Sequence, residues 1–100
     1  MTLTVVFRRA ARREFDVAAL WYEERRFGLG AEFTSEINRA VVMAASNPQR
    51  FPIMYRDTRC LRVRRFPYSV FFRAEAKRIV VLAVFHARRD PAIWQQRASP

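Results

Sequence analysis

The chain has 100 residues, about one domain, which we expect to span residues 1–100. Its composition, 51% hydrophobic and 14% aromatic, excludes a disordered chain, and no apolar run approaches the ~20 residues that cross a bilayer. The net charge is +10, and the residues from Arg59 onward hold ten basic side chains against two acidic ones, a net +8. Most are arginines, whose planar fork pairs with phosphate or carboxylate, so this surplus predicts a polyanionic partner.

Cysteine and histidine usage excludes several kinds of site. Cys60 and His86 are the only residues of their types, which argues against an internal disulfide or a dedicated zinc site. The N-terminus lacks the basic region and the long apolar stretch of a signal peptide. We therefore expect a cytoplasmic domain without a metal, a cofactor or a membrane segment.

The first half of the chain predicts a strand and two helices. Leu3, Val5 and Phe7 alternate with less apolar neighbours, as in a short strand. Residues 8–27 contain no Gly or Pro, and their apolar positions follow helical spacing: Ala11, Phe15, Ala18, Ala19 and Tyr22. Residues 28–30, Gly-Leu-Gly, should break this helix, and a second should run over 31–46 until Asn47-Pro48 ends it. Residues 8–46 thus predict a helical hairpin.

The second half predicts strands. Residues 53–55 form a brief edge strand, 59–65 and 68–73 follow with period-two patterns, and 79–85 is apolar on both faces, as in a central covered strand. Asp90-Pro91 is typical of a helix start, so 92–97 should be a short terminal helix. The expected fold is α+β with the order βααβββ(α), a helical hairpin packed on a largely antiparallel sheet.

Several short motifs now occur in a characteristic order. They are Trp21-Tyr22-Glu23, the Gly-Leu-Gly at 28–30, Asn47-Pro48, Arg-Arg-Phe-Pro-Tyr at 64–68, Val-Phe-His-Ala-Arg-Arg-Asp-Pro at 84–91, and Trp94. In this order, over residues 5–97, the chain resembles the RelE/ParE family of type II toxin–antitoxin toxins. It looks closest to the ParE-like, plasmid stabilisation branch.

The resemblance implies a toxin that a cognate antitoxin neutralises in a hetero-oligomer. The antitoxin should carry an acidic, partly disordered segment that adds a helix or a strand to the toxin. Characterised ParE-like members poison DNA gyrase and so block replication, which is the activity we expect. The alternative is a RelE-like endoribonuclease that cuts mRNA in the ribosome, so whether the chain is an enzyme stays open here. A third option is a decayed toxin that retains only antitoxin binding.

The candidate catalytic residues belong to the ribonuclease alternative. Cleavage through a 2′-hydroxyl needs an acid, a base and cations around the phosphate, and the candidates are Arg62, Arg64, Arg73 and His86. For His86 we favour a structural role, in which the ring hydrogen-bonds backbone near the last turn. The chain also has no tyrosine after Tyr68, which we expect to face the core, and this departure from RNA-cleaving relatives disfavours the alternative.

Two sets of residues are candidates for binding a macromolecule. Arg62 and Arg64 lie at i, i+2 on a predicted strand and should project together. The expected surface for the target or the antitoxin comprises Arg62, Arg64, Arg73, Arg88, Arg89 and Trp94. Antitoxin docking is further expected at Trp21, at the edge of the first helix's apolar stripe, and at Ile53 and Tyr55 on the edge strand.

The remaining notable residues are assigned to packing or to the surface. Tyr22 shares the apolar stripe of the first helix and should belong to the core. Glu23 and Glu24 should form solvated surface pairs with Arg25 and Arg26. Cys60 has no base at a readable spacing, so we do not expect a nucleophile there.

Overall fold

The computed structural model describes residues 2–98; Met1, Ser99 and Pro100 of the expected domain 1–100 lie outside the described residues. The elements are β1 (Thr4–Phe7), α1 (Arg9–Arg25), α2 (Leu29–Ser46), the 3-10 turn η1 (Pro48–Arg50), β2 (Ile53–Tyr55), β3 (Thr58–Arg62), β4 (Tyr68–Ala74), β5 (Arg78–His86) and α3 (Ala92–Gln95).

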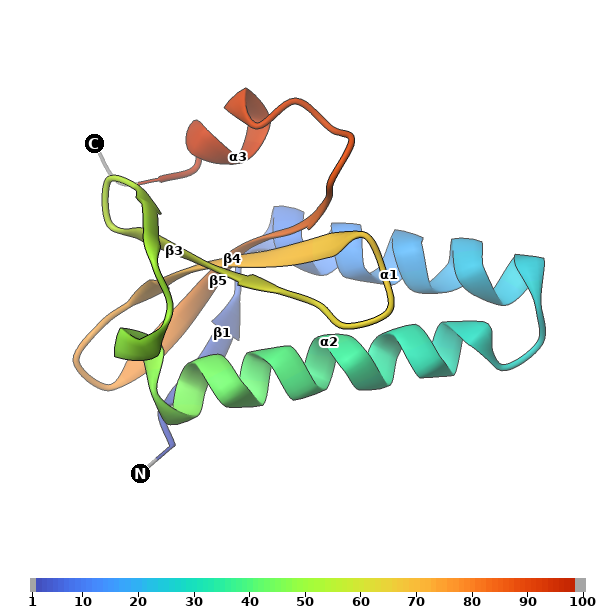
Figure 1. Cartoon of the computed structure of the whole chain (residues 1–100), viewed down its shortest axis with the longest axis horizontal. Helices are drawn as coiled ribbons and strands as arrows, with labels where there is room; N and C mark the ends of the chain where they lie inside the picture. Colours follow the sequence, from blue (N-terminus) through green and yellow to red (C-terminus); the bar gives the residue numbers. More distant parts are fainter. Residues whose placement is uncertain (1, 99–100) are drawn as a thin grey trace.

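Five strands form one sheet in the order β1-β5-β4-β3-β2. The pairing of β1 with β5 is parallel and the other three pairings are antiparallel. The hairpin of α1 and α2 packs along one side of the sheet, and α3 lies on the other side (Figure 1). The predicted α+β fold, with its helical hairpin and largely antiparallel sheet, is confirmed, although four strands follow the hairpin where the order βααβββ(α) has three. None of the helices formed by residues 2–98 combines the length and the apolar character that crossing a membrane requires.

The main core lies between the helical hairpin and the sheet. Phe15 of α1 and Phe33 of α2 pack edge to face with ring centroids 6.1 Å apart, and Phe72 of β4 is fully buried. Tyr22 contacts Phe33 at 5.1 Å, as expected of a core residue. Burying such rings supplies most of the driving force that holds the helices on the sheet.

A smaller core lies on the opposite face of the sheet. Trp94 of α3 stacks on Phe71 of β4, with ring centroids 4.0 Å apart and an interplanar angle of 17°. Phe85 and Ala83 of β5 complete the cluster. Because both faces are covered, the stretch from Ile79 to Phe85 is buried throughout, which confirms the prediction of a central strand.

The turn between α1 and α2 differs from the prediction in two ways. Glu23 forms no ion pair within residues 2–98; its carboxylate accepts the backbone N–H of Gly28 at 2.9 Å and that of Gly30 at 2.9 Å. It thereby satisfies donors at the start of α2, where the helix dipole also favours an anion. In addition, α2 begins at Leu29 and not at Ala31, so Gly30 is helical.

The two glycines of this turn serve different purposes. Gly28 has φ +87°, a left-handed conformation that other residues adopt only at a cost, although a side chain there would meet nothing within 4 Å. Gly30 lets the helices approach each other, since a Cβ would come within 2.6 Å of the carbonyl oxygen of Ala19. Glu23, Gly28 and Gly30 of this motif therefore stabilise the turn that joins α1 to α2.

Two elements of the second half, β3 and α3, are shorter than expected. The strand predicted over 59–65 runs over Thr58–Arg62, because the chain turns at Arg65, whose φ is +70°. The terminal helix predicted over 92–97 runs over Ala92–Gln95. The helix starts at Ala92 with Pro91 at the N-cap, one residue after the predicted cap Asp90. The Asp90 carboxylate still accepts the N–H of Ala92 at 2.9 Å.

Candidate functional site

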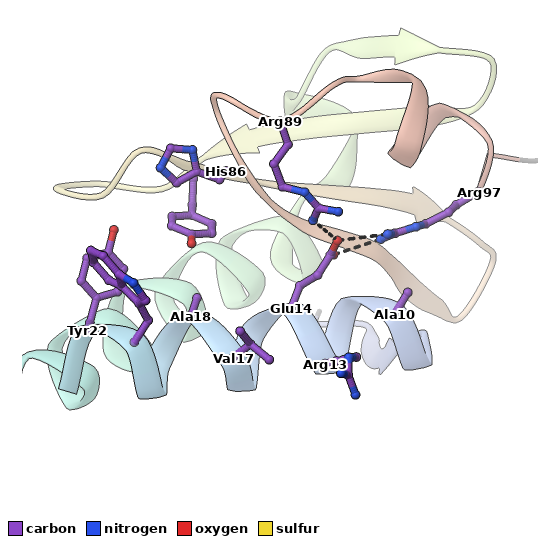
Figure 2. Close-up of a pocket in the computed structure, with 11 residues that line it drawn as sticks. Ala10, Arg13, Glu14, Val17, Ala18, Tyr22, His86, Arg89 and Arg97 are labelled. Atoms are coloured by element: carbon purple, nitrogen blue, oxygen red, sulfur yellow. Dashed lines mark hydrogen bonds and ion pairs between the residues drawn. The ribbon is translucent and has the colours of Figure 1, made fainter. Parts of the chain in front are cut away.

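A groove of about 630 Å³ runs between α1 and the segment that follows β5. Figure 2 shows α1 forming one wall and the strand side with the C-terminal segment forming the other. The α1 wall is largely apolar, with Val17, Ala18 and Trp21. The remaining lining residues are polar, charged or at the ends of the groove: Ala10, Arg13, Glu14, Tyr22, Tyr68, His86, Arg89 and Arg97.

Glu14 is the central charged residue of this groove. Its carboxylate accepts from Arg89 Nη1 at 2.6 Å and from Arg97 Nη1 at 2.9 Å and Nη2 at 3.0 Å (Figure 2). It also accepts the backbone N–H of Val84 at 3.1 Å. Only 13% of the Glu14 side chain is exposed, so these contacts are partly shielded from water. The carboxylate thus ties the segment after β5 to α1.

Side chains reach the β5 backbone beyond Val81, because β1 pairs with β5 only over Arg78–Val81 and leaves the rest of that edge without a strand within residues 2–98. The register of β4 and β5 shifts between Phe71 and Phe72, so that Leu82 has no opposite residue in the pairing. Arg97 Nη1 donates to the carbonyl oxygen of Leu82 at 3.0 Å, beside the bond from Val84 to Glu14. Glu14 and Arg97 therefore satisfy β5 backbone groups that lie beyond the end of β1.

Sequence analysis overlooked Glu14, although a signal was present. It lies three residues after the buried Ala11 and four before the buried Ala18, on the side of α1 that faces the protein. An acidic residue on that face needs a cation or backbone donors. The arginines that it binds are 75 and 83 residues away in the sequence, so no local pattern identifies them.

At the inner side of the groove, His86 and Tyr68 lie against each other. Their ring centroids are 5.1 Å apart with an interplanar angle of 82°, and His86 Nδ1 accepts the backbone N–H of Arg88 at 3.0 Å. A hydrogen bond between the His86 ring and the backbone is what we expected if this residue has a structural role. Tyr68 packs against the main core as expected, and burial raises its pKa.

Three arginines gather at one end of the sheet. Arg62 ends β3 opposite Ser69, near the start of β4, and Arg88 follows β5, which ends where β4 begins. Arg64 lies in the turn at 63–67, and the N–H of Ala87 donates to the carbonyl oxygen of Pro67 at 2.8 Å, which joins that turn to the Arg88 turn. All three arginines are exposed. We name Arg62, Arg64 and Arg88 the basic sheet end.

The predicted reason for placing Arg62 beside Arg64 needs correction. The i, i+2 rule applies within a strand, but β3 ends at Arg62 and Arg64 lies beyond it. The turn contacts, rather than strand alternation, keep the two residues at the same end of the sheet.

Arg73 does not belong to this surface. It pairs with Thr58 in the β3–β4 register, four residues from the position of Arg62, a separation of about 13 Å along the strands. Its guanidinium is mostly covered and binds the Glu75 carboxylate through Nε at 3.2 Å and Nη2 at 3.1 Å. The four ribonuclease candidates are therefore not assembled around one point.

Two further binding candidates take structural roles. Arg89 forms an ion pair with Glu14 and so belongs to the groove rather than to the basic sheet end. Trp94 is only 5% exposed because it stacks on Phe71 and covers the sheet, so the expectation of a surface ring is wrong. Trp94 is buried because α3 packs on the sheet face opposite the helical hairpin, where Phe71, Ala83 and Phe85 lie.

The antitoxin-docking candidates lie at two separate places. Trp21 lines the groove, is 48% exposed, and has the Arg25 guanidinium 3.9 Å from its ring centroid. Ile53 is exposed on β2, which is an edge strand as predicted. Tyr55 is half-buried and faces the smaller core, with its ring centroid 6.1 Å from that of Trp94.

Cys60 is not placed to act as a nucleophile. Burial raises the pKa of its thiol, which disfavours the reactive thiolate form.

Comparison with known proteins identifies the family. Residues 5–91 match the family model described as the ParE toxin of the type II toxin–antitoxin system parDE. Comparison with curated proteins gave no match. Among solved structures, the fold is similar to a chain of the chromosomal ParDE toxin–antitoxin system from P. aeruginosa, with a TM-score of 0.72, 20% identity, and coverage of 87% of this chain and 98% of that chain. The chain belongs to the ParE toxin family and is a type II toxin of the ParE-like kind.

Proposed function

We propose that this toxin acts in the cytoplasm by binding DNA gyrase, and that an acidic antitoxin neutralises it. The observation that carries the proposal is the family match over residues 5–91, because ParE-like toxins are the gyrase-directed branch that the sequence resembles. Membership of a toxin–antitoxin family also implies a protein antitoxin as partner.

The geometry supports a binding mode of inhibition over catalysis. His86 Nδ1 is engaged by backbone and Arg73 by Glu75, and Arg73 lies about 13 Å along the strands from the position of Arg62. General acid–base cleavage of RNA needs such groups around one phosphate. A toxin that works by contact needs only an exposed complementary surface, and the basic sheet end supplies one.

The basic sheet end is the part of this surface that we assign to the target. None of the ion pairs formed within residues 2–98 involves Arg62, Arg64 or Arg88. Their charges are therefore directed at solvent and attract an acidic protein surface or the DNA that gyrase holds.

The test is a pair of assays on the purified chain. We expect inhibition of gyrase supercoiling, with cleaved DNA trapped, and intact mRNA in a translating ribosome extract. Replacing the basic sheet end by glutamine (Arg62→Gln, Arg64→Gln, Arg88→Gln) should weaken the inhibition by about tenfold or more, because charged contacts steer association.

The matched control removes the same charge elsewhere. Arg8, Arg9 and Arg39 are exposed and take part in none of the ion pairs within residues 2–98, so their triple glutamine variant should inhibit gyrase like the wild type. Equal losses in both triple variants would refute the assignment of the target surface. Cut mRNA together with unimpaired supercoiling would refute gyrase as the target.

A further inference from the structure

Phe27, in the turn that joins α1 to α2, is the most exposed large apolar side chain among residues 2–98. Its exposed fraction is 93%, against 61% for Leu20, which comes next. It belongs to neither of the two cores. Exposure alone assigns no role, because isolated apolar side chains are common on protein surfaces. The backbone, the charges and the position of the turn supply the further observations.

Hydrogen bonds on both sides of Phe27 fix the backbone of this turn. The N–H of Leu29 donates to the carbonyl oxygen of Arg26 at 3.0 Å, which closes a four-residue turn with Phe27 and Gly28 at its centre. Gly28 has φ +87° and ψ −13°, values typical of the third residue of a type II turn. The Glu23 carboxylate accepts the N–H of Gly28 at 2.9 Å and so ties the turn to α1. A side chain presented on a fixed turn loses less conformational entropy on binding than one on a mobile loop.

The charges around this turn nearly cancel, which distinguishes it from the basic sheet end. Glu32 of α2 binds Arg26 at 3.4 Å and Arg65 at 2.6 Å. The acidic side chains near the turn are no fewer than the basic ones: Glu23, Glu24, Glu32 and Glu36 against Arg25, Arg26 and Arg65. Such surroundings do not attract a nucleic acid or an acidic helix. An exposed aromatic ring there fits an apolar pocket of a folded protein.

The turn lies toward the same end of the molecule as the basic sheet end. Phe66, in the turn at 63–67 that also carries Arg64, packs on Phe33 of α2 with ring centroids 5.2 Å apart. Phe33 follows Phe27 by six positions, a rise of about 9 Å in a helix. Figure 1 shows the α1–α2 turn and the β3–β4 connection toward the same end. One partner surface can therefore contact Phe27 and Arg64 together.

We propose that Phe27 is the apolar anchor of the target interface and enters an apolar pocket of gyrase, beside acidic groups that face the basic sheet end. The inference rests on the gyrase target of the proposed function and adds a contact residue and its chemistry. Charged contacts steer the approach of two proteins, whereas a buried aromatic ring slows their dissociation. The two regions therefore act on different rate constants.

The experiment measures the binding of the purified chain to immobilised gyrase by surface plasmon resonance. Phe27→Ala should raise the dissociation rate constant and weaken affinity by about tenfold or more, because a buried aromatic contact is lost. Its association rate constant should stay within about twofold of the wild type. The triple glutamine variant of the basic sheet end should instead lower the association rate constant and its salt dependence. Phe27→Leu keeps an apolar side chain and should retain most of the affinity.

Met54→Ala is the matched control. Met54 is a 57% exposed apolar residue on the edge strand β2, outside the helical hairpin, so this variant should bind gyrase like the wild type. Both substitutions remove an exposed side chain, and thermal unfolding confirms that each variant is folded. The antitoxin encoded beside this chain serves as a second probe, and Phe27→Ala should bind it like the wild type.

Each outcome has a distinct meaning. If the wild-type chain does not bind gyrase, the target is refuted and the assignment of Phe27 falls with it. If the wild type binds and Phe27→Ala matches Met54→Ala, the anchor is refuted while the target stands. If Phe27→Ala weakens binding to the antitoxin and not to gyrase, Phe27 belongs to the antitoxin interface and the proposal is overturned.

Discussion

Two groups of arginines in the second half of the chain differ in what faces them. Arg89 and Arg97 bind Glu14, and Arg73 and Arg78 bind Glu75, so one carboxylate serves two guanidiniums in each case. The basic sheet end has no such acid within residues 2–98. Identical side chains thus hold the fold together in one region and direct charge outward in the other.

The contrast between paired and unpaired arginines shows how a surplus of basic residues in a sequence should be interpreted. A count of ten basic residues against two acidic ones suggests one continuous basic surface. In the structure, acids from outside that segment also count, because Glu14 of α1 reaches across to the C-terminal arginines. The positive charge that remains available to a partner is smaller than the count suggests and is localised at the basic sheet end.

The largest effect on stability should come from Glu14. In Glu14→Ala, Arg89 and Arg97 lose their carboxylate and the N–H of Val84 loses its acceptor, so the free energy of unfolding should fall by about 3 kcal/mol. Urea unfolding measures this. Glu14→Gln keeps an acceptor for Val84 and should lose less; an unchanged midpoint in Glu14→Ala would contradict the structural role of the paired arginines.

The next largest effect on stability should come from Glu23, whose carboxylate accepts hydrogen bonds from backbone N–H groups and not from arginine. Glu23→Ala removes the acceptor of the Gly28 and Gly30 N–H groups and should cost about 1–2 kcal/mol, as losing a helix cap does. Denaturant unfolding of the variant tests it. Glu24→Ala, at an exposed neighbouring position, is the control and should stay near the wild type; equal losses would argue against capping.

A smaller, pH-dependent effect should come from Glu75. Hydrogen bonds from Arg78 and Arg73 hold the pKa of Glu75 below its usual value, so its folded pKa lies below its unfolded one. The stabilisation is therefore present above the unfolded pKa and is lost as the pH falls through the folded pKa. The difference in melting temperature between about pH 6 and about pH 3 should be smaller in Glu75→Gln than in the wild type. If the melting temperature falls by the same amount between these two pH values in Glu75→Gln and in the wild type, the ion pairs of Glu75 do not contribute to the pH dependence of stability.

The smallest effect should come from the basic sheet end. Single changes Arg62→Gln, Arg64→Gln and Arg88→Gln should each stay within about 0.5 kcal/mol of the wild type, because exposed charges without partners contribute little to folding. Thermal unfolding provides the measurement. A loss as large as that of Glu14→Ala would erase the distinction between the two groups of arginines.

Local patterns predicted most of the fold because its elements follow their periodicities. The stripe containing Phe15 and Tyr22 placed α1, and the continuous apolar run from Ile79 to Phe85 marked a strand covered on both faces. The ends were less predictable, because the left-handed turn at Arg65 and the close approach at Gly30 depend on neighbouring elements.

The candidate site was only partly predictable. Exposed arginines at element ends were identifiable, but Trp94, placed among the binding residues, packs into the smaller core. Its partner Phe71 sits on a sheet face whose covering depends on where α3 docks. Periodicity describes which residues share a face; it does not tell what covers that face.

By itself, the sequence determined the α+β architecture, the family and the basic character of the protein, because apolar period and residue type are local properties of the chain. Only the tertiary structure decided which charges are available, since ion pairing depends on which distant elements meet. Glu14 binds Arg89 and Arg97, which lie 75 and 83 positions away in the sequence, and these ion pairs create the charged wall of the groove. The division between paired and outward-facing arginines is thus a product of folding.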